Sequence, residues 1–202
     1  MRELLMIVDY GEVNASVDGV FANTASHSYW SSALYVSDPS LAWGVDFHYG
    51  DDVHEGIDNT FYVRCVRGEA LKMSHFKRMD NIVTDTTTHL QWQDNNSTQT
   101  LQKSFQDAVA YCEHLSLGES SDWRLPNITE LLSLANKKTS PAVSPAFEST
   151  SSLWLYRSST TDVSSGDFAR AVWFKNGGDW IYPKSSLLYA RCVRSSKWKI
   201  SK

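Results

Sequence analysis

Cysteines, histidines and clustered acids are the residues of this chain whose types could carry chemistry. A catalytic thiol needs a nearby base and an activated thiolate, and nothing in the sequence around Cys65, Cys112 or Cys192 suggests either. Metal-binding histidines would be paired on one face of a helix or strand. No such spacing occurs among His27, His48, His54, His75, His89 and His114. We therefore expect no catalytic residue, no metal and no cofactor, and a protein that is not an enzyme.

Two of the cysteines end stretches of similar sequence. Tyr62 to Arg67 reads Tyr-Val-Arg-Cys-Val-Arg, and Tyr189 to Arg194 reads Tyr-Ala-Arg-Cys-Val-Arg, 127 positions later. With this offset and no gap, 15 of the 39 residues in 29–67 are identical to their counterparts in 156–194. A self-match at one fixed offset indicates a repeated structural unit.

We interpret the chain as tandem copies of one domain, the first of them incomplete. Glu3-Leu4-Leu5 matches Glu130-Leu131-Leu132 at the same offset, but the residues before this helix in the later copy have no earlier counterpart. We therefore expect the first copy to lack its first half. The resulting division is an incomplete first repeat in 1–68, a connector in 69–79, a complete domain in 80–195 and a tail in 196–202.

Two helices and several short strands must position the residues of the later copy. The stripe of one amphipathic helix is formed by Leu101, Phe105, Ala108, Val109, Cys112 and Leu115. A second helix begins at Ile128, because Asn127 is a good N-cap and Glu130 completes a capping box. Residues 82–84 and 90–92 flank a Thr-rich turn and predict a hairpin.

The strands that end each copy follow one pattern. Alternating apolar residues predict a strand over 41–47 and another over 168–174. A turn with glycine follows each of them. We then expect a closing strand over 61–66, which carries Cys65, and another that passes through Cys192.

The composition argues against two classes of partner. A net charge of -4 provides no general attraction to nucleic acid or to anionic membranes. No apolar run approaches the roughly 20 residues that span a bilayer, and the N-terminus lacks the zones of a signal peptide. A hydrophobic content of 42%, with eight Trp, supports packed cores.

Four short motifs in the later copy form a family pattern: Leu90-Gln91-Trp92-Gln93, Ala110-Tyr111-Cys112-Glu113, Asp122-Trp123-Arg124-Leu125-Pro126 and Arg191-Cys192-Val193-Arg194. They resemble the DUF1566 family, which is also named for the C-terminal domain of the Legionella collagen-like adhesin. The resemblance spans 80–195 in full and 2–68 as the second half of another copy.

The resemblance implies an α+β fold related to C-type lectin-like domains, with two helices packed on small antiparallel sheets, here duplicated. It also implies a bacterial protein exported to the periplasm or the cell surface. For some members it implies adhesion and glycan binding, while most members have no established activity.

Cys112 and Cys192 are candidates for a disulfide. The first lies on the buried helical stripe and the second on the closing strand, so a bridge would join helix to sheet. It would close a loop of about 80 residues and stabilise the domain by roughly 4 kcal/mol. The alternative is a pair of buried free thiols in a reducing compartment. Cys65 is expected to be unpaired, because its partner would belong to the missing half.

The positions at which the two copies differ contain a candidate ligand platform. Trp173, Trp180 and Tyr182 replace residues of other types in the first copy, with Arg170 and Asp179 nearby. Aromatic and polar side chains grouped in this way suit a sugar or a protein partner. The alternative is that these aromatics belong to a small, Trp-rich core.

Two further features suggest chemistry, but a structural role is the better interpretation of each. The acids Asp46, Asp51, Asp52, Glu55 and Asp58 could form a calcium loop, since calcium takes hard oxygen ligands. Only Asp52 recurs in the later copy, as Asp179, which favours a solvated turn. For Arg124 we expect a buried structural side chain that bonds loop carbonyls.

The leading hypothesis is a non-enzymatic binding or adhesion module that recognises a glycan or protein ligand. The alternative is a structural domain whose incomplete first repeat mediates homo-oligomerisation. In that case the uncovered sheet edge and helix face of the first repeat would join two chains.

Overall fold

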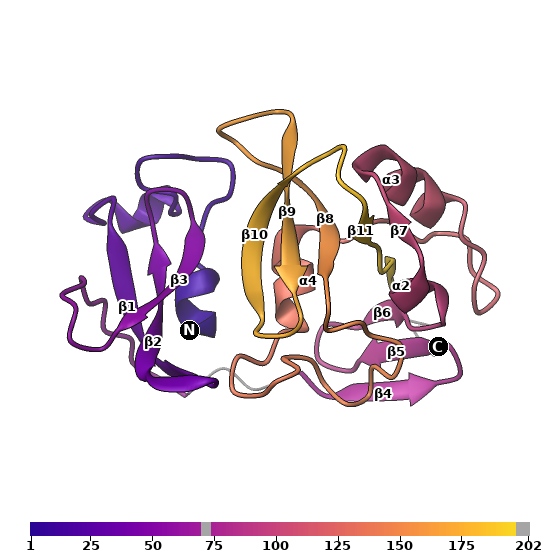
Figure 1. Cartoon of the computed structure of the whole chain (residues 1–202), viewed down its shortest axis with the longest axis horizontal. Helices are drawn as coiled ribbons and strands as arrows, with labels where there is room; N and C mark the ends of the chain where they lie inside the picture. The colour runs from indigo at the N-terminus through magenta and orange to yellow at the C-terminus, as the bar shows by residue number, and fades with distance from the viewer. Residues whose placement is uncertain (70–73, 197–202) are drawn as a thin grey trace, which may run out of the picture.

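The computed structural model describes residues 1–69 and 74–196, which form a mixed α+β structure. Its first sheet has the order β1-β2-β3 and lies at the N-terminal end of the molecule (Figure 1). Short helices accompany this sheet. The elements are α1 (Arg2–Leu5), the 3-10 helix η1 (Gly19–Phe21), β1 (Ser28–Tyr35), β2 (Asp38–Asp46) and β3 (Asp51–Gly56).

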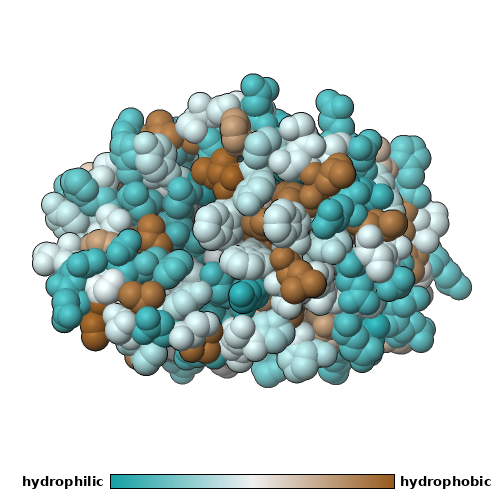
Figure 2. All heavy atoms as spheres, in the orientation of Figure 1, coloured by the Kyte–Doolittle hydropathy of each residue, from teal (hydrophilic) through white to brown (hydrophobic). Residues whose placement is uncertain are grey.

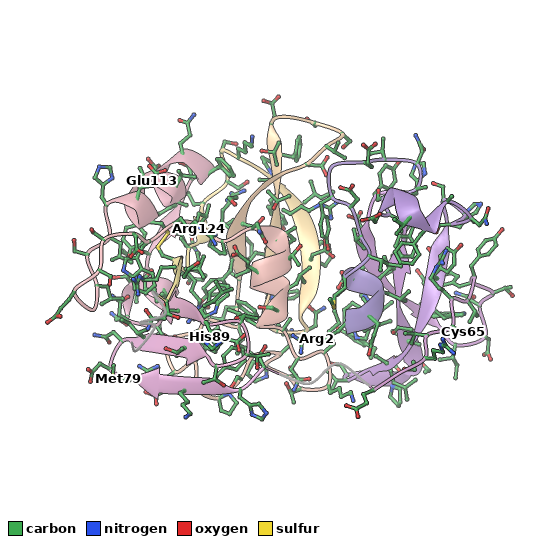
Figure 3. The ribbon with its side chains drawn as sticks, turned by 180° about the vertical axis from the view of Figure 1, so that it is seen from behind. Arg2, Cys65, Met79, His89, Glu113 and Arg124 are labelled. Carbon is green, nitrogen blue, oxygen red and sulfur yellow. A yellow bond between two sulfur atoms is a disulfide. The ribbon has the colours of Figure 1, made fainter. Side chains whose placement is uncertain are left out.

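A five-stranded sheet occupies the middle of the molecule in the order β10-β9-β8-β11-β7. Its strands are β7 (Gln102–Lys103), β8 (Leu155–Thr161), β9 (Phe168–Trp173), β10 (Gly178–Pro183) and β11 (Leu188–Tyr189). Neighbouring strands are antiparallel except β8 and β11, which are parallel. Helix α4 (Ile128–Ser133) covers the rear face, as the view from behind shows (Figure 3). The opposite face is turned toward the viewer in Figure 1.

The third sheet has the order β12-β6-β5-β4. Its strands are β4 (Phe76–Met79), β5 (Ile82–Asp85), β6 (Leu90–Gln93) and β12 (Val193–Ser195), with α2 (Ser97–Thr100) and α3 (Phe105–Glu113) beside it. Strands β5 and β6 confirm the predicted hairpin. The Asp85 carboxylate shapes its turn by accepting the Thr87 backbone N–H at 2.8 Å.

Local sequence determines how the two principal helices begin. Helix α3 starts after Ser104, whose hydroxyl accepts the Asp107 N–H. Helix α4 has the predicted capping box: Asn127 accepts the Glu130 N–H at 2.8 Å, and Glu130 accepts the Asn127 N–H at 2.9 Å. The prediction for the first helix was too long by one turn, because Leu101 lies outside α3 in an extended conformation.

The first sheet and three strands of the central sheet pair in the same register after a shift of 127 residues. Tyr29 pairs with Val45 and Tyr156 with Val172. Every partner pair between β2 and β3, from Leu41–Gly56 to Asp46–Asp51, has a counterpart between β9 and β10. The turn glycines correspond as well, since Gly50 and Gly177 have φ of 75° and 80°. A side chain at Gly50 would also meet Val8 at 2.7 Å.

Each part of the molecule has its own core. The largest core lies between α4 and the central sheet and includes Leu131, Tyr156, Val172 and Phe174. A second core around the disulfide joins α3 to Trp123 and Ala190. In the N-terminal segment, defined as residues 1–69, a separate core is built from Leu4, Val17, Tyr29, Val45 and Phe47.

The predicted strand over 61–66 is wrong. In this stretch only Tyr62 forms a β-bridge, with Tyr29, and Cys65 is exposed. The corresponding residues of the C-terminal segment, defined as residues 74–196, form strands because β6, β7 and β8 supply partners. A strand needs such a neighbour for its backbone hydrogen bonds. Among the described residues, the N-terminal segment provides 61–66 with little pairing beyond that bridge.

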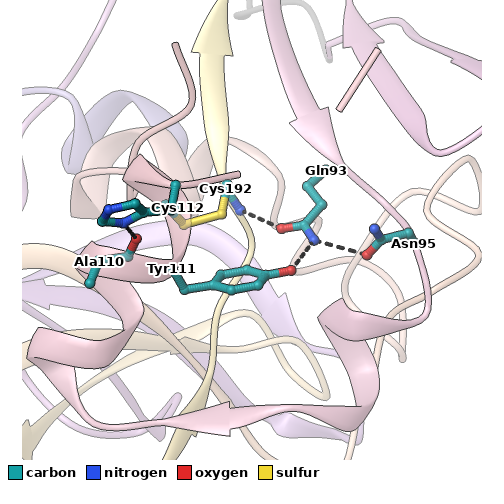
Figure 4. Close-up of a disulfide and its surroundings, with 7 residues drawn as sticks. Gln93, Asn95, Ala110, Tyr111, Cys112 and Cys192 are labelled. Carbon is teal, nitrogen blue, oxygen red and sulfur yellow. Dashed lines mark hydrogen bonds between the residues drawn. A yellow bond between two sulfur atoms is a disulfide. The ribbon is translucent and has the colours of Figure 1, made fainter. Parts of the chain in front are cut away.

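The predicted disulfide is confirmed. Cys112 of α3 is bonded to Cys192, with Cα atoms 5.4 Å apart (Figure 4). The buried amide of Gln93 lies beside it: its oxygen accepts the Cys192 N–H at 3.3 Å, and its nitrogen donates to Tyr111 Oη at 2.6 Å. The bridge thus joins α3 to the chain that leads into β12. Cys65 is free, also as expected.

Candidate functional site

The front face of the central sheet carries the three aromatic residues that are candidates for binding a ligand. Trp173 is paired with Gly178, Trp180 with Ala171 and Tyr182 with Ala169, so all three aromatic side chains share one face. Val172 alternates to the other face, where it packs against α4. The structure therefore brings these aromatics together.

The exposure of these aromatics differs along the face. Trp180 is 45% exposed, whereas Trp173 and Tyr182 are half-buried against a small core of Leu155, Ala171 and Leu188. The Trp173 indole N–H donates to Ser152 O at 3.0 Å, which fixes the ring. The face therefore has a rigid apolar base and an accessible indole.

More apolar side chains reach the surface close to this face. Trp154 lies just before β8 and is 43% exposed, while Leu187 lies just before β11. Figure 2 shows apolar side chains gathered over the middle of the surface, where the central sheet lies in Figure 1. Exposed apolar side chains grouped in this way commonly mark a binding surface. We call Trp173, Trp180 and Tyr182 the aromatic face.

Arg157 lies within this face and was not foreseen from the sequence. It is fully buried, and its guanidinium donates to Pro183 O at 3.2 Å and Ser186 O at 2.8 Å. Burial lowers its pKa to about 10. Among the described residues its Nε and Nη1 atoms have no hydrogen-bond partner. Arg157 thus holds the loop after β10, next to Tyr182, by its contacts with carbonyl groups.

Arg170 and Asp179 do not join the aromatic face. They occupy positions of the opposite parity on β9 and β10 and are buried at the contact with the N-terminal segment. Arg170 donates to Asp179 at 2.8 Å, to Asp51 at 2.7 Å and to Tyr49 O at 2.6 Å. These two polar groups hold segments of the chain together, and their side chains point to the face of β9 and β10 opposite to the Trp180 indole.

The contact between β3 and β10, which we call the seam, is built from charged residues. Lys137 forms an ion pair with Asp52 and lies 3.7 Å from the centre of the Trp43 ring. Burial lowers the pKa of Lys137 to about 7. Burial also raises the pKa of Asp51 to about 6, although the neighbouring Arg170 acts in the opposite direction.

A groove of about 570 Å³ follows the seam, with Glu55 of β3 and Trp180 of β10 among its lining residues.

The acids considered as a calcium loop are distributed around the first sheet, and Asp51 and Asp52 form ion pairs with basic residues of the C-terminal segment. Within residues 1–69 and 74–196, no three His, Cys, Asp or Glu side chains are grouped to hold a metal ion.

The prediction for Arg124 is wrong. Its side chain is 46% exposed and forms a two-point ion pair with Glu130, at 2.8 and 2.6 Å. The ion pair lies beside the capping box, so Glu130 serves both the helix start and Arg124. A surface helix start can satisfy its own polar groups in this way without burying the arginine.

Strand parity was the signal that could have separated Arg170 and Asp179 from the aromatics. Arg170 and Trp173 are three residues apart on one strand, and Asp179 and Trp180 are adjacent, so each pair must point to opposite faces. No comparable signal was available for Lys137, because its partner Asp52 lies 85 residues away.

The fold and site define an α+β module that a disulfide stabilises and that carries an aromatic face and an internal, charged seam. None of the helices in the described part of the chain is long and apolar enough to cross a membrane. The family model of the Lcl C-terminal domain matches residues 1–67 and again residues 81–194. The chain therefore belongs to the Lcl C-terminal domain family. No curated protein matches it.

Proposed function

We propose that this protein is a non-enzymatic binding or adhesion module of a bacterial surface or exported protein, and that its ligand is a glycan. The observation that carries the proposal is Trp180, an indole 45% exposed on a face whose other aromatics are fixed by packing. The family is named for an adhesin domain, which supports the same function. As part of this proposal, residues 80–195 form a C-type lectin-like domain and 1–68 an incomplete copy of it.

An exposed tryptophan suits a sugar ring because it offers an apolar surface with a polar N–H at its edge. Trp173 and Tyr182 extend this surface, and their half-buried positions reduce the entropy lost when a ligand binds. Arg157 keeps the adjacent loop in place through Pro183 O and Ser186 O. The arrangement favours recognition of a flat, partly apolar ligand.

The test is a glycan array with the intact protein, followed by titration of any glycan that binds. Trp180→Ala should weaken binding about tenfold, which corresponds to about 1.4 kcal/mol, while thermal stability changes little. Met79→Ala is the matched control, because Met79 is 74% exposed on β4, away from the aromatic face. Equal binding by native protein and Trp180→Ala, or an array without any signal, would contradict the proposal.

A second candidate is assembly through the N-terminal segment. A groove of about 570 Å³ there is lined by residues that include Leu4, Trp30 and Cys65. The positions corresponding to Leu4 and Cys65 after the shift of 127 are Leu131 and Cys192, which are covered in the C-terminal segment. A second copy of the chain is the occupant we consider. Sedimentation velocity at increasing concentration should then show a dimer, and a monomer throughout would remove this candidate.

A further inference from the structure

The seam between β3 and β10 is symmetric in its hydrogen bonds. The Asp52 N–H donates to Asp179 Oδ1 at 3.0 Å, and the Asp179 N–H donates to Asp52 Oδ1 at 3.0 Å. These two residues are 127 positions apart, which is the shift that relates the pairing registers of the two sheets. Equivalent residues that exchange the same bond in both directions are the mark of a twofold contact.

Two cation–aromatic contacts flank this centre, and they obey the same relation. Arg170 lies 4.7 Å from the centre of the Tyr10 ring, and Lys137 lies 3.7 Å from the centre of the Trp43 ring. Position 10 corresponds to 137, and position 43 corresponds to 170, after the shift of 127. Each contact therefore joins position 10, or its equivalent 137, to position 43, or its equivalent 170. In one contact the cation is at 170 and the ring at 10, and in the other the cation is at 137 and the ring at 43.

This exchange puts both cations on one side of the seam. The C-terminal segment supplies Lys137 and Arg170, while the N-terminal segment supplies the two rings and the carboxylates of Asp51 and Asp52. Two C-terminal surfaces brought together in this geometry would place Lys137 against Arg170 twice, without Asp51 to balance the charge. Buried like charges that face each other in this way are strongly unfavourable.

We infer that the seam is a quasi-twofold docking surface whose partner is chosen by positions 10, 43, 137 and 170. The surface with Lys137 and Arg170 accepts the surface with Tyr10 and Trp43 of the same chain, and it disfavours contact with a second surface that carries Lys137 and Arg170. Two effects produce this specificity. Contact between two cationic surfaces is unfavourable, and contact between the cationic surface and the aromatic surface is favourable.

The two-way exchange of residues between equivalent positions tests this inference in the full-length chain. Tyr10→Lys with Trp43→Arg makes both sides cationic. Lys137→Tyr with Arg170→Trp makes both sides aromatic. The four substitutions together restore opposite composition with the sides reversed. The measurement is amide hydrogen exchange at Asp52 and Asp179, whose N–H groups donate across the seam.

We expect both amides to lose at least tenfold in protection in either two-residue variant and to regain most of it in the four-residue variant. The amides of Val193, bonded to Arg124 O, and Ser16, bonded to Phe47 O, report whether each segment is still folded. If the variant with Tyr10→Lys and Trp43→Arg unfolds the N-terminal segment, the variant with Lys137→Tyr and Arg170→Trp provides the test by itself. That variant leaves the sequence of the N-terminal segment unchanged. Unchanged protection at Asp52 and Asp179 would overturn the inference, as would a four-residue variant that stays folded without recovery.

Discussion

The residues of the Arg-Cys-Val-Arg motif act differently in the two segments. Arg191 is fully buried and donates to Asp94 at 2.6 Å and to Ser149 O at 3.0 Å. Its counterpart Arg64 instead lies 5.3 Å from the centre of the Phe21 ring and bonds the Thr24 hydroxyl. A buried pair such as Arg191 and Asp94 is sustained by its additional hydrogen bonds, since the ionic contact alone does not repay desolvation. The same four-residue motif therefore lies in different environments in the two segments.

Asp51 gives the seam a predictable dependence on pH. Its pKa is raised to about 6, so the folded protein binds more protons than the unfolded chain between about pH 4 and 6. The contribution of Asp51 to stability is therefore present at pH 4 and is lost as the pH rises through 6. Asp51→Asn should remove this part of the pH dependence in thermal unfolding between pH 4 and 7.

The control for Asp51 is Asp38→Asn. Asp38 is exposed, and its hydrogen bonds with Ser40 lower its pKa, so no loss of stability is expected from it over this range. Burial also raises the pKa of Asp179, and Asp51→Asn should therefore leave part of the effect. Identical pH profiles for the native protein and Asp51→Asn would contradict the assignment.

At the scale of elements, the available tertiary partners decide which closing segment becomes regular. Cys192 is tied to α3, and the residues after it pair with β6 as β12. Around Cys65 the described chain has no such helix, and the segment forms no strand. Tertiary partners therefore override a strand preference that is the same in both sequences.

Removal of the disulfide should destabilise the C-terminal segment. Replacement of both Cys112 and Cys192 by Ser frees a loop of 80 residues, for which the chain-entropy model gives about 4 kcal/mol. Urea unfolding, followed by the fluorescence of the buried Trp92 and Trp123, measures the loss. Cys65→Ser is the matched control and should unfold as the native protein does, because Cys65 is exposed and unpaired. A loss below 1 kcal/mol for the double variant would contradict a structural role for the bridge.

At the scale of the molecule, the two segments have different structural roles. The C-terminal segment holds the aromatic face, and the N-terminal segment covers the buried charges of Arg170 and Asp179 at the seam. If the seam opened, Arg170 would lose its contacts with Asp51 and Tyr49 O. Because β10 carries Trp180 on one face and Asp179 on the other, the seam also supports the strand that presents the exposed indole.

The sequence alone was sufficient for the local features of this protein. The capping box at Asn127, the hairpin of β5 and β6 and the turn glycines follow from preferences that act within a few residues. Pairing of Cys112 with Cys192 could be predicted because helical periodicity put one of them on a buried face. The common register of the two sheets follows the offset of 127 that the sequence already contains.

Only the tertiary structure determined three features: the contacts of the seam, the irregular conformation of the closing segment at Cys65 and the exposed fraction of each aromatic side chain. Lys137 meets Asp52, and Arg170 meets Asp51, across 85 and 119 residues, and no local preference encodes such a contact. Trp180 and Trp43 are both tryptophans on strands, yet one is 45% exposed and the other 1%. That difference arises because burial depends on which surface packs against a strand, and this is a property of the whole folded chain.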